Sequence, residues 1–174
     1  MIELSKSLAK IIQTHIKPTD EVLSLGVGIG NIVRHLTCKH IVGLDAFEPY
    51  LYCAKKYCET ILWDLNTHPL PFETDSFDVV FGLDIIEHLE KDVGLKLIDE
   101  VERITKRTAI FFTPEGFLTQ TGDAWHLGGE RWQEHRSGWD SYYFKDLGYK
   151  IQMYPGDKAH DRDYEAFIAW KDLK

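Results

Sequence analysis

Short apolar runs alternate with stretches of helix-like spacing along most of the chain. The runs predict strands, because they are brief, rich in β-branched and aromatic residues, and bounded by polar or glycine-containing turns. Five of them precede residue 115, at 21–25, 40–45, 60–65, 76–84 and 108–114. The fourth is almost continuously apolar, which is typical of a central strand.

Between these strands, apolar residues recur at three- or four-residue spacing, which predicts helices. The predicted helices span 1–18, 29–36, 47–57, 93–104 and 139–147. Pro18 ends the first of them and Gly148 the last. Strands that alternate with helices in this way indicate an α/β fold, in which a mostly parallel sheet is covered by helices on both faces.

Two further strands, 149–154 and 164–170, follow near the C-terminus. The polar turn between them permits an antiparallel pair, so the sheet is predicted to have seven strands. Residues 115–138 show no clear period and are long for a plain connection. Long connections of this kind are often lids or binding loops, and we expect such a role for this segment.

The chain has 174 residues and a formal charge of −8, and none of its apolar runs approaches membrane-spanning length. Its length fits a single domain, residues 1–174. The negative charge disfavours a nucleic-acid partner, and we expect no membrane partner. Three cysteines without paired spacing favour a reduced, cytoplasmic setting over a disulfide framework or a zinc site. We expect a monomer or a homodimer.

Three glycines, Gly26, Gly28 and Gly30, stand at alternate positions after the first predicted strand. Glycine lets the backbone approach a ligand closely, and a helix start supplies unpaired N–H groups. The dinucleotide pattern G-x-G-x-x-G does not fit, because the sixth position from Gly26 is Asn31. The loop therefore predicts either a site for a different nucleotide-like cofactor or a tight turn without a ligand.

Asp45 ends the second predicted strand, 19 residues after Gly26. An acidic side chain at this place can accept hydrogen bonds from both hydroxyls of a ribose. The alternative is that Asp45 caps the helix that begins near Pro49, a frequent role of aspartate. The succession of glycine loop, strand and acid favours the ribose role.

The order of these segments resembles that of the class I S-adenosylmethionine-dependent methyltransferases, in particular a small, type 11-like subgroup. The resemblance runs from about Glu21 to the end of the chain, and it rests on "LSLGVGIG", "VGLDAFEPYL", "ILWDLNTHPLPFETDSFDVVFGLDIIEHL" and "HRSGWDSYYFKDLGYKI". It implies a Rossmann-like, doubly wound sheet and S-adenosyl-L-methionine as the cofactor. It also implies transfer of a methyl group, by in-line displacement, to an acceptor that we expect to be a small molecule.

The resemblance further implies which residues hold the cofactor. Beside the glycine loop and Asp45, Asp64 would accept a hydrogen bond from the adenine amino group, next to the backbone of Leu65. The alternative for Asp64 is a loop residue that caps neighbouring N–H groups. Phe47 would pack on the adenine or the ribose, and Leu83 would line the methionine arm.

One position departs from the family pattern. An acid two residues before the first glycine normally helps to hold the methionine ammonium, but this chain has Ser24 there. Main-chain carbonyls near Gly26 and Gly82, or a water, would then take over. This departure keeps open a second hypothesis, a non-catalytic S-adenosylmethionine-binding regulator or subunit. A third, a nicotinamide oxidoreductase, is opposed by Asn31 and by the antiparallel C-terminal pair.

Methyl transfer from a sulfonium has no obligatory catalytic residue, because the enzyme must mainly align the acceptor with the methyl group and exclude water. A base is needed only when the nucleophile arrives protonated. Asp84 and His88 follow the fourth strand, where the crevice of such a sheet opens, and they are the candidates for that role. If 84–88 is helical, both lie on one face. The alternative is a helix cap at Asp84 and an exposed pair of Glu87 and His88.

Residues 115–138 concentrate amphipathic side chains, among them Trp125, His126 and His135. They predict a lid that contacts a polar substrate. The alternative is a surface loop whose tryptophans cover the sheet edge. His126 and His135, together with Asp123, match no known metal-ligand spacing, so no metal is expected.

Overall fold

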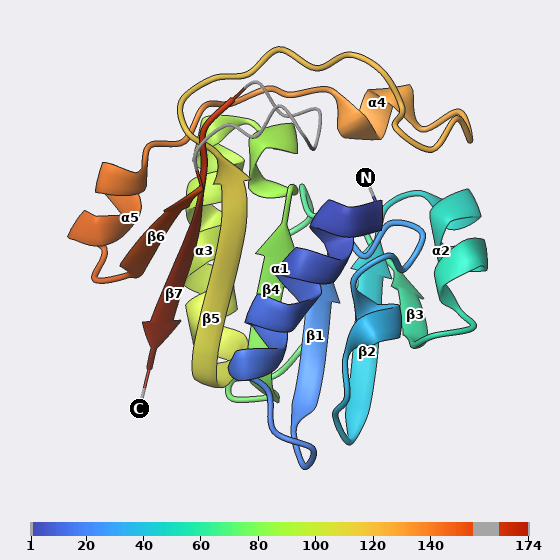
Figure 1. Ribbon diagram of the computed structural model, residues 1–174, viewed down its shortest axis with the longest axis vertical. Coiled ribbons are helices and arrows are strands. Elements are labelled where there is room, and N and C mark those ends of the chain that lie inside the picture. The colour runs from blue at the N-terminus through green and yellow to red at the C-terminus, as the bar shows by residue number, and fades with distance from the viewer. Residues whose placement is uncertain (1, 155–163, 174) are drawn as a thin grey trace.

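The protein is described by a computed structural model that covers residues 2–154 and 164–173, with side chains from Ser5 onward (Figure 1). One sheet holds seven strands in the order β3-β2-β1-β4-β5-β7-β6. The strands are β1 (Glu21–Leu25), β2 (His40–Asp45), β3 (Glu59–Leu62), β4 (Phe77–Leu83), β5 (Thr105–Pro114), β6 (Lys150–Tyr154) and β7 (Ala166–Asp172). The first five pair in parallel, and β7 is antiparallel to β5 and β6. The predicted sheet is confirmed, although the turn 155–163 lies outside the described residues.

Helices cover both faces of this sheet, as predicted (Figure 1). They are α1 (Ile2–Thr14), α2 (Glu48–Ala54), α3 (Lys91–Ile104), α4 (Glu130–Gln133) and α5 (Ser141–Asp146), with two short 3-10 helices, η1 (Val33–His35) and η2 (Ile86–His88). Ile12 of α1 and Leu51 of α2 belong to the core on one face. Leu97 of α3 and Phe144 of α5 belong to the core on the other. Within residues 2–154 and 164–173, no helix combines the length and apolar character that a membrane span requires.

The middle strand is β4, as its apolar run predicted. Val79 and Phe81 pack into one core and Phe77 and Val80 into the other, so both faces of this strand are buried. The chain runs outward from β1 to β3 on one side and from β4 to β7 and β6 on the other. The loops after β1 and β4 therefore diverge, which leaves a crevice at the carboxyl ends of these two strands.

The predicted helix at 29–36 is wrong, because only the three residues of η1 are helical. Chain length explains the difference. Nine residues separate Gly30 from the start of β2, and as an α-helix they would span only about 14 Å. The chain must return along a strand of six residues, a distance of about 20 Å. The connection therefore turns through η1 and leaves helical geometry at Leu36, while Val33 still packs into the core.

Several predicted boundaries also differ by two or more residues. The second helix ends at Ala54 instead of residue 57, the fifth strand begins at Thr105 instead of residue 108, and the last strand is Ala166–Asp172 instead of 164–170. The first helix ends at Thr14 instead of residue 18, the third strand ends at Leu62 instead of residue 65, and the last helix begins at Ser141 instead of Trp139. Trp139 is fully buried in an extended segment, where its N–H donates to the Gly116 carbonyl. The burial of its large indole and this backbone pairing outweigh the helical spacing that the sequence shows.

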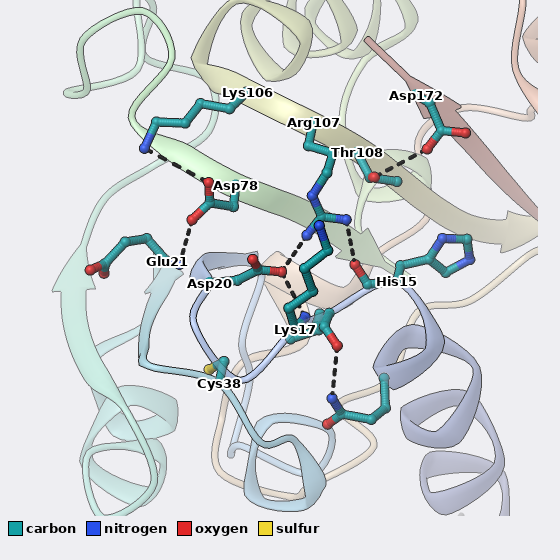
Figure 2. Close-up of polar contacts among 12 residues, drawn as sticks. His15, Lys17, Asp20, Glu21, Cys38, Asp78, Lys106, Arg107, Thr108 and Asp172 are labelled. Carbon is teal, nitrogen blue, oxygen red and sulfur yellow. Dashed lines mark hydrogen bonds and ion pairs between the residues drawn. The ribbon is translucent and has the colours of Figure 1, made fainter. Parts of the chain in front are cut away.

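Arg107 ties the connection between α1 and β1 to the sheet (Figure 2). Its guanidinium donates to the Asp20 carboxylate and to the His15 carbonyl, the latter at 2.9 Å. Asp20 is only 4% exposed, and it also accepts from the Lys17 N–H at 2.7 Å. The ion pair thus holds the chain that follows α1 against β5, at a point far from the crevice.

Replacing Arg107 tests this anchor. Arg107→Met leaves the buried Asp20 carboxylate without its cation, so we expect the free energy of unfolding in urea to fall by about 2 kcal/mol. The neighbouring Lys106→Met is the matched control, because Lys106 Nζ lies 3.9 Å from Asp78 Oδ1 at a more exposed site. Its loss should stay below about 1 kcal/mol. Equal losses in the two variants would contradict the anchoring role of Arg107.

Candidate functional site

A cavity of about 490 Å³ lies at the carboxyl ends of the parallel strands, beneath the segment 115–138, which Figure 1 shows passing above the sheet to α4. The predicted site residues that line it are Gly26, Asp45, Asp64, Leu65, Leu83, Asp84, His88, Trp125 and His135. The fold therefore gathers residues from five separate loops around one space. Gly28, Gly30, Phe47 and His126 do not line this cavity.

The loop after β1 needs glycine for two reasons. Gly26 and Gly28 adopt left-handed backbone angles, with φ of 61° and 53°, which side chains disfavour. A Cβ on Gly26 would lie 2.5 Å from Ile85, and one on Gly28 would lie 2.4 Å from the ring of Trp125. Gly30 instead faces the end of α2. Gly26 thus lines the cavity, Gly28 makes room for the Trp125 ring, and Gly30 allows α2 to pack closely.

Asp45 connects this loop to the end of β2. The Gly28 N–H donates to Asp45 Oδ2 at 2.9 Å, and the Phe47 N–H donates to Oδ1 at 3.0 Å. Burial raises the pKa of Asp45, and these backbone hydrogen bonds oppose the rise. The N-cap of α2 is Phe47 and not Asp45, although Asp45 orders the chain just before the helix. A carboxylate offers about four lone-pair positions, so these backbone donors leave acceptor capacity for a ligand.

Asp64 also has both a local partner and access to the cavity. Its Oδ1 accepts from the backbone and side-chain N–H groups of Asn66, at 2.9 and 2.7 Å. Its Oδ2 has no partner within the described part of the chain. Leu65 beside it is buried and lines the same wall. Phe47 packs instead against the ring of Tyr50, with 4.8 Å between the centroids.

The condition that would place Asp84 and His88 on one helix face is not met, because only Ile86–His88 is helical, as the 3-10 helix η2. Asp84 has φ of 48°, and its N–H still donates to the Phe112 carbonyl of β5 at 2.8 Å. The sheet hydrogen bond extends one residue past β4, and the left-handed angle then turns the chain into η2. Asp84 is exposed at the cavity wall, and its backbone lies outside the helical turn that carries His88.

Glu87 is buried, with only 2% exposed, so the alternative of an exposed Glu87–His88 pair is wrong for Glu87. The Thr113 hydroxyl donates to Glu87 Oε2 at 3.0 Å. The Glu87 carbonyl accepts from the N–H groups of Arg136 and Ser137. Burial and the nearby charge of Asp84 raise the pKa of Glu87 well above its ordinary value.

His88 and His135 lie side by side, with 4.8 Å between ring centroids. Nδ1 of His88 lies 3.3 Å from the Glu134 carbonyl, and Nδ1 of His135 lies 2.6 Å from the Leu118 carbonyl. Because a carbonyl can only accept, each Nδ1 carries the proton and each Nε2 keeps a lone pair. Burial, followed by the neighbouring His135, lowers the pKa of His88 to about 4, and burial also lowers that of His135. Both rings are neutral near pH 7.

Asp123 organises the segment above the cavity. It is 5% exposed, and it accepts from the N–H groups of Trp125, Leu127 and Gly129 and from Gln133 Nε2. Burial opposes ionisation, but these hydrogen bonds prevail and hold the pKa of Asp123 at about 2. The segment is irregular in sequence, yet a buried carboxylate fixes its backbone.

Trp125 is the side chain that this arrangement places over the glycine loop. Its ring packs edge-on against Tyr50, at 4.6 Å between centroids. Its buried indole N–H has no acceptor among the described residues. Tyr50 also lines the cavity, and its hydroxyl accepts from Gln133 Nε2 at 2.9 Å. Sequence reasoning missed Tyr50, because nothing distinguishes it from an ordinary residue of the predicted helix. His126 is exposed.

A family model described as a methyltransferase domain matches residues 23–113. The match covers just over half of the 174 residues, from β1 to the end of β5. It includes the glycine loop together with Asp45, Asp64 and Asp84. No curated protein matches the chain by sequence.

Solved structures share the fold over nearly the whole chain. A candidate methyltransferase from Bacillus halodurans C-125 is 14% identical, with a TM-score of 0.71 over 97% of this chain and 98% of that one. Magnesium protoporphyrin IX methyltransferase from Synechocystis PCC 6803, with bound SAH (S-adenosylhomocysteine), is 16% identical, with a TM-score of 0.70 over 99% and 83%. A SAM-dependent methyltransferase from Archaeoglobus fulgidus is 13% identical, with a TM-score of 0.67 over 98% and 95%. At these identities the likeness is one of fold.

The contact between Gly28 and Trp125 gives a prediction about the cavity. Gly28→Ala adds a methyl group at a left-handed position and inside the space of the indole ring. We expect it to lower the free energy of unfolding by more than the roughly 1–2 kcal/mol of backbone strain alone. In a Trp125→Ala background, the cost of Gly28→Ala should fall to that strain.

Gly128→Ala is the matched control. Its φ is 86°, and an added Cβ there meets nothing within 4 Å, so it reports backbone strain without a clash. Urea unfolding of the three single variants and the double variant gives the comparison. The same cost of Gly28→Ala in both backgrounds would show that Trp125 does not rest on the loop in solution.

Proposed function

The chain belongs to the methyltransferase domain family, and on that premise we propose that it transfers the methyl group of S-adenosyl-L-methionine (SAM) to a small-molecule acceptor. One observation carries the proposal. The glycine loop, Asp45, Asp64 and Asp84 line a single cavity, although they belong to the ends of different strands. A nucleoside and a reactive group can therefore be held together at the crevice where such sheets bind ligands.

The proposed cofactor lies across the loop after β1. Asp45 accepts hydrogen bonds from the ribose hydroxyls with the lone pairs that Gly28 and Phe47 leave unused. Asp64 accepts from the adenine amino group through its unpartnered Oδ2, beside Leu65. These assignments are supported by the two carboxylates lining the same cavity.

The methionine end lies toward β4 in this proposal. Leu83 lines the methionine arm, and main-chain carbonyls near Gly26 and Gly82 accept from its ammonium. Ser24 does not take part, because it is buried within β1, between β2 and β4, and does not line the cavity. The remaining glycines act indirectly. Gly28 is held by Asp45, and Gly30 lets α2 approach.

The chemistry follows from position. The sulfonium methyl is already electrophilic, so the cavity has to orient the acceptor in line with the bond to sulfur and keep water out. Asp84 stands at the end of β4 with its side chain at the cavity wall. It is the proposed proton acceptor for a nucleophile that arrives protonated, and His88 is the second candidate.

We assign selectivity for the acceptor to the segment 115–138. Trp125 and His135 line the cavity from this side, and the unpartnered indole N–H of Trp125 offers a donor to a bound ligand. The exposed His126 is a proposed contact only for the part of an acceptor that projects from the cavity. In this proposal the segment covers the cavity as a lid and also contacts the acceptor.

A protein that binds SAM without catalysis is the alternative, and the serine at position 24 is the observation that favours it. Asp84 at the cavity wall and membership of the methyltransferase family favour the enzyme. The two are distinguished by incubating the protein with methyl-labelled SAM and an extract of small molecules. Only an enzyme transfers the label to a compound of the extract.

Calorimetry tests the cofactor site directly. SAM and SAH should bind to the wild-type protein, whereas NAD should not. Asp64→Asn should weaken SAH binding by about tenfold, because it loses a charged acceptor worth roughly 1.5 kcal/mol. Its free energy of unfolding should hardly change, since asparagine keeps an oxygen that accepts from the Asn66 N–H.

Asp92→Asn is the matched control, since it removes the same charge from an exposed position in the first turn of α3, away from the cavity. It should leave SAH affinity unchanged. Binding of NAD without a response to SAM or SAH would overturn the proposed function. Equal SAH affinity of the wild-type and Asp64→Asn proteins would show that Asp64 does not contact the adenine.

A further inference from the structure

Three side chains meet on one wall of the cavity, and the methyl-transfer mechanism does not require them together. Glu87 and His88 come from η2, directly after β4, and His135 comes from the segment 115–138. One ligand-type atom from each lies within 4.8 Å of the others. All three residues line the cavity. The fold therefore brings His135 next to Glu87 and His88, although His135 lies 47 positions after His88 in the sequence.

The Glu87 carboxyl is incompletely satisfied. The side chain is buried, and Thr113 supplies one hydrogen bond to Oε2. Its Oε1 is buried without a hydrogen-bond partner among the described residues. A buried carboxyl oxygen without a donor or cation is costly. Asp84 nearby adds negative charge instead of compensating it. A cation at this point would satisfy the unpartnered oxygen.

The two histidines are prepared as neutral ligands. The Nδ1–H groups of His88 and His135 are engaged by the carbonyls of Glu134 and Leu118. This leaves the Nε2 lone pair of each ring to bind a metal. A backbone carbonyl behind the other ring nitrogen is the arrangement that typically orients metal-bound histidines.

We propose that Glu87, His88 and His135 form a binding site for a divalent transition-metal ion such as Zn²⁺. Two imidazoles and a carboxylate are a common ligand set for these ions. Bonds of about 2.1 Å in a tetrahedral site place ligand atoms about 3.4 Å apart. The present separations are at most 4.8 Å, so small side-chain movements suffice.

The site faces the cavity, so its remaining coordination positions are left for water or for an oxygen atom of the methyl acceptor. It also joins the lid to the sheet, because His135 belongs to the segment 115–138 and Glu87 follows β4. The expectation of no metal considered His126, His135 and Asp123. The Asp123 carboxylate is already occupied by its four donors, and the ligand set proposed here is a different one.

The site is defined by side chains and not by the cofactor, so it is tested without SAM. The protein is first treated with a chelator and dialysed, and Co²⁺ is then added as a spectroscopic probe. We expect visible d–d absorption with one Co²⁺ per chain, and loss of this absorption when Zn²⁺ is added. Glu87→Gln and His135→Ala should each weaken Zn²⁺ binding by more than about tenfold.

Two comparisons keep the test specific. Glu87→Gln should leave the metal-free protein at least as stable in urea as the wild type, because it replaces a buried carboxyl with a neutral group of the same shape. His126→Ala, on the same segment but outside the cluster, should bind Zn²⁺ as the wild type does.

Failure of the wild type to bind Co²⁺ and Zn²⁺ would overturn the proposal. Unchanged affinity in Glu87→Gln and His135→Ala, or an equal loss in His126→Ala, would overturn it as well. None of these outcomes alters the SAH calorimetry, so the metal site and the methyl-transfer function fail separately.

Discussion

The cavity depends on the hydrogen bond that the Gly28 N–H donates to Asp45 Oδ2. This bond joins the loop after β1 to the end of β2, while the other oxygen of Asp45 holds the start of the chain toward α2. Parallel strands bring these loops to one edge of the sheet, but only a specific contact fixes how far apart they stand. Asp45 therefore acts as a structural brace and as part of the cavity wall. Of the two roles considered from the sequence, the N-cap of α2 falls to Phe47, and the ribose contact of Asp45 stays a prediction.

A second buried carboxylate, Asp123, fixes the backbone of the segment 115–138, as Asp45 fixes the loop after β1. Its backbone hydrogen bonds hold the turn that carries Trp125 over Gly28. The indole of Trp125 can therefore pack on the loop only because Gly28 has no side chain. The segment 115–138 is also held near its end, where the N–H groups of Arg136 and Ser137 donate to the Glu87 carbonyl. An irregular segment acquires a defined shape because its backbone N–H groups donate to one buried carboxylate, Asp123, and to the main-chain carbonyl of Glu87.

The sequence predicted the strands and their order along the chain, and nine of its thirteen predicted site residues line the cavity. Apolar runs and strand-end acids depend on local spacing, which a sequence shows. It failed where the outcome depends on distance across the fold. The length of the return path to β2 reduces the helix after Gly30 to η1, and a sheet hydrogen bond beyond β4 keeps Asp84 out of η2. The burial of Glu87 had a signal, since Ile86 and Leu89 flank it. The proximity of His88 and His135 had none, because their contact arises from tertiary packing alone.

The loop after β1 and the segment 115–138 form the two sides of one proposed cofactor site. Amide hydrogen exchange with and without SAH tests it most directly, because binding should suppress local opening wherever the ligand is enclosed. We expect slower exchange in residues 26–31 and in residues 117–136 at the same SAH concentration. Unchanged exchange in both segments, or protection of the loop while the lid exchanges as before, would contradict it.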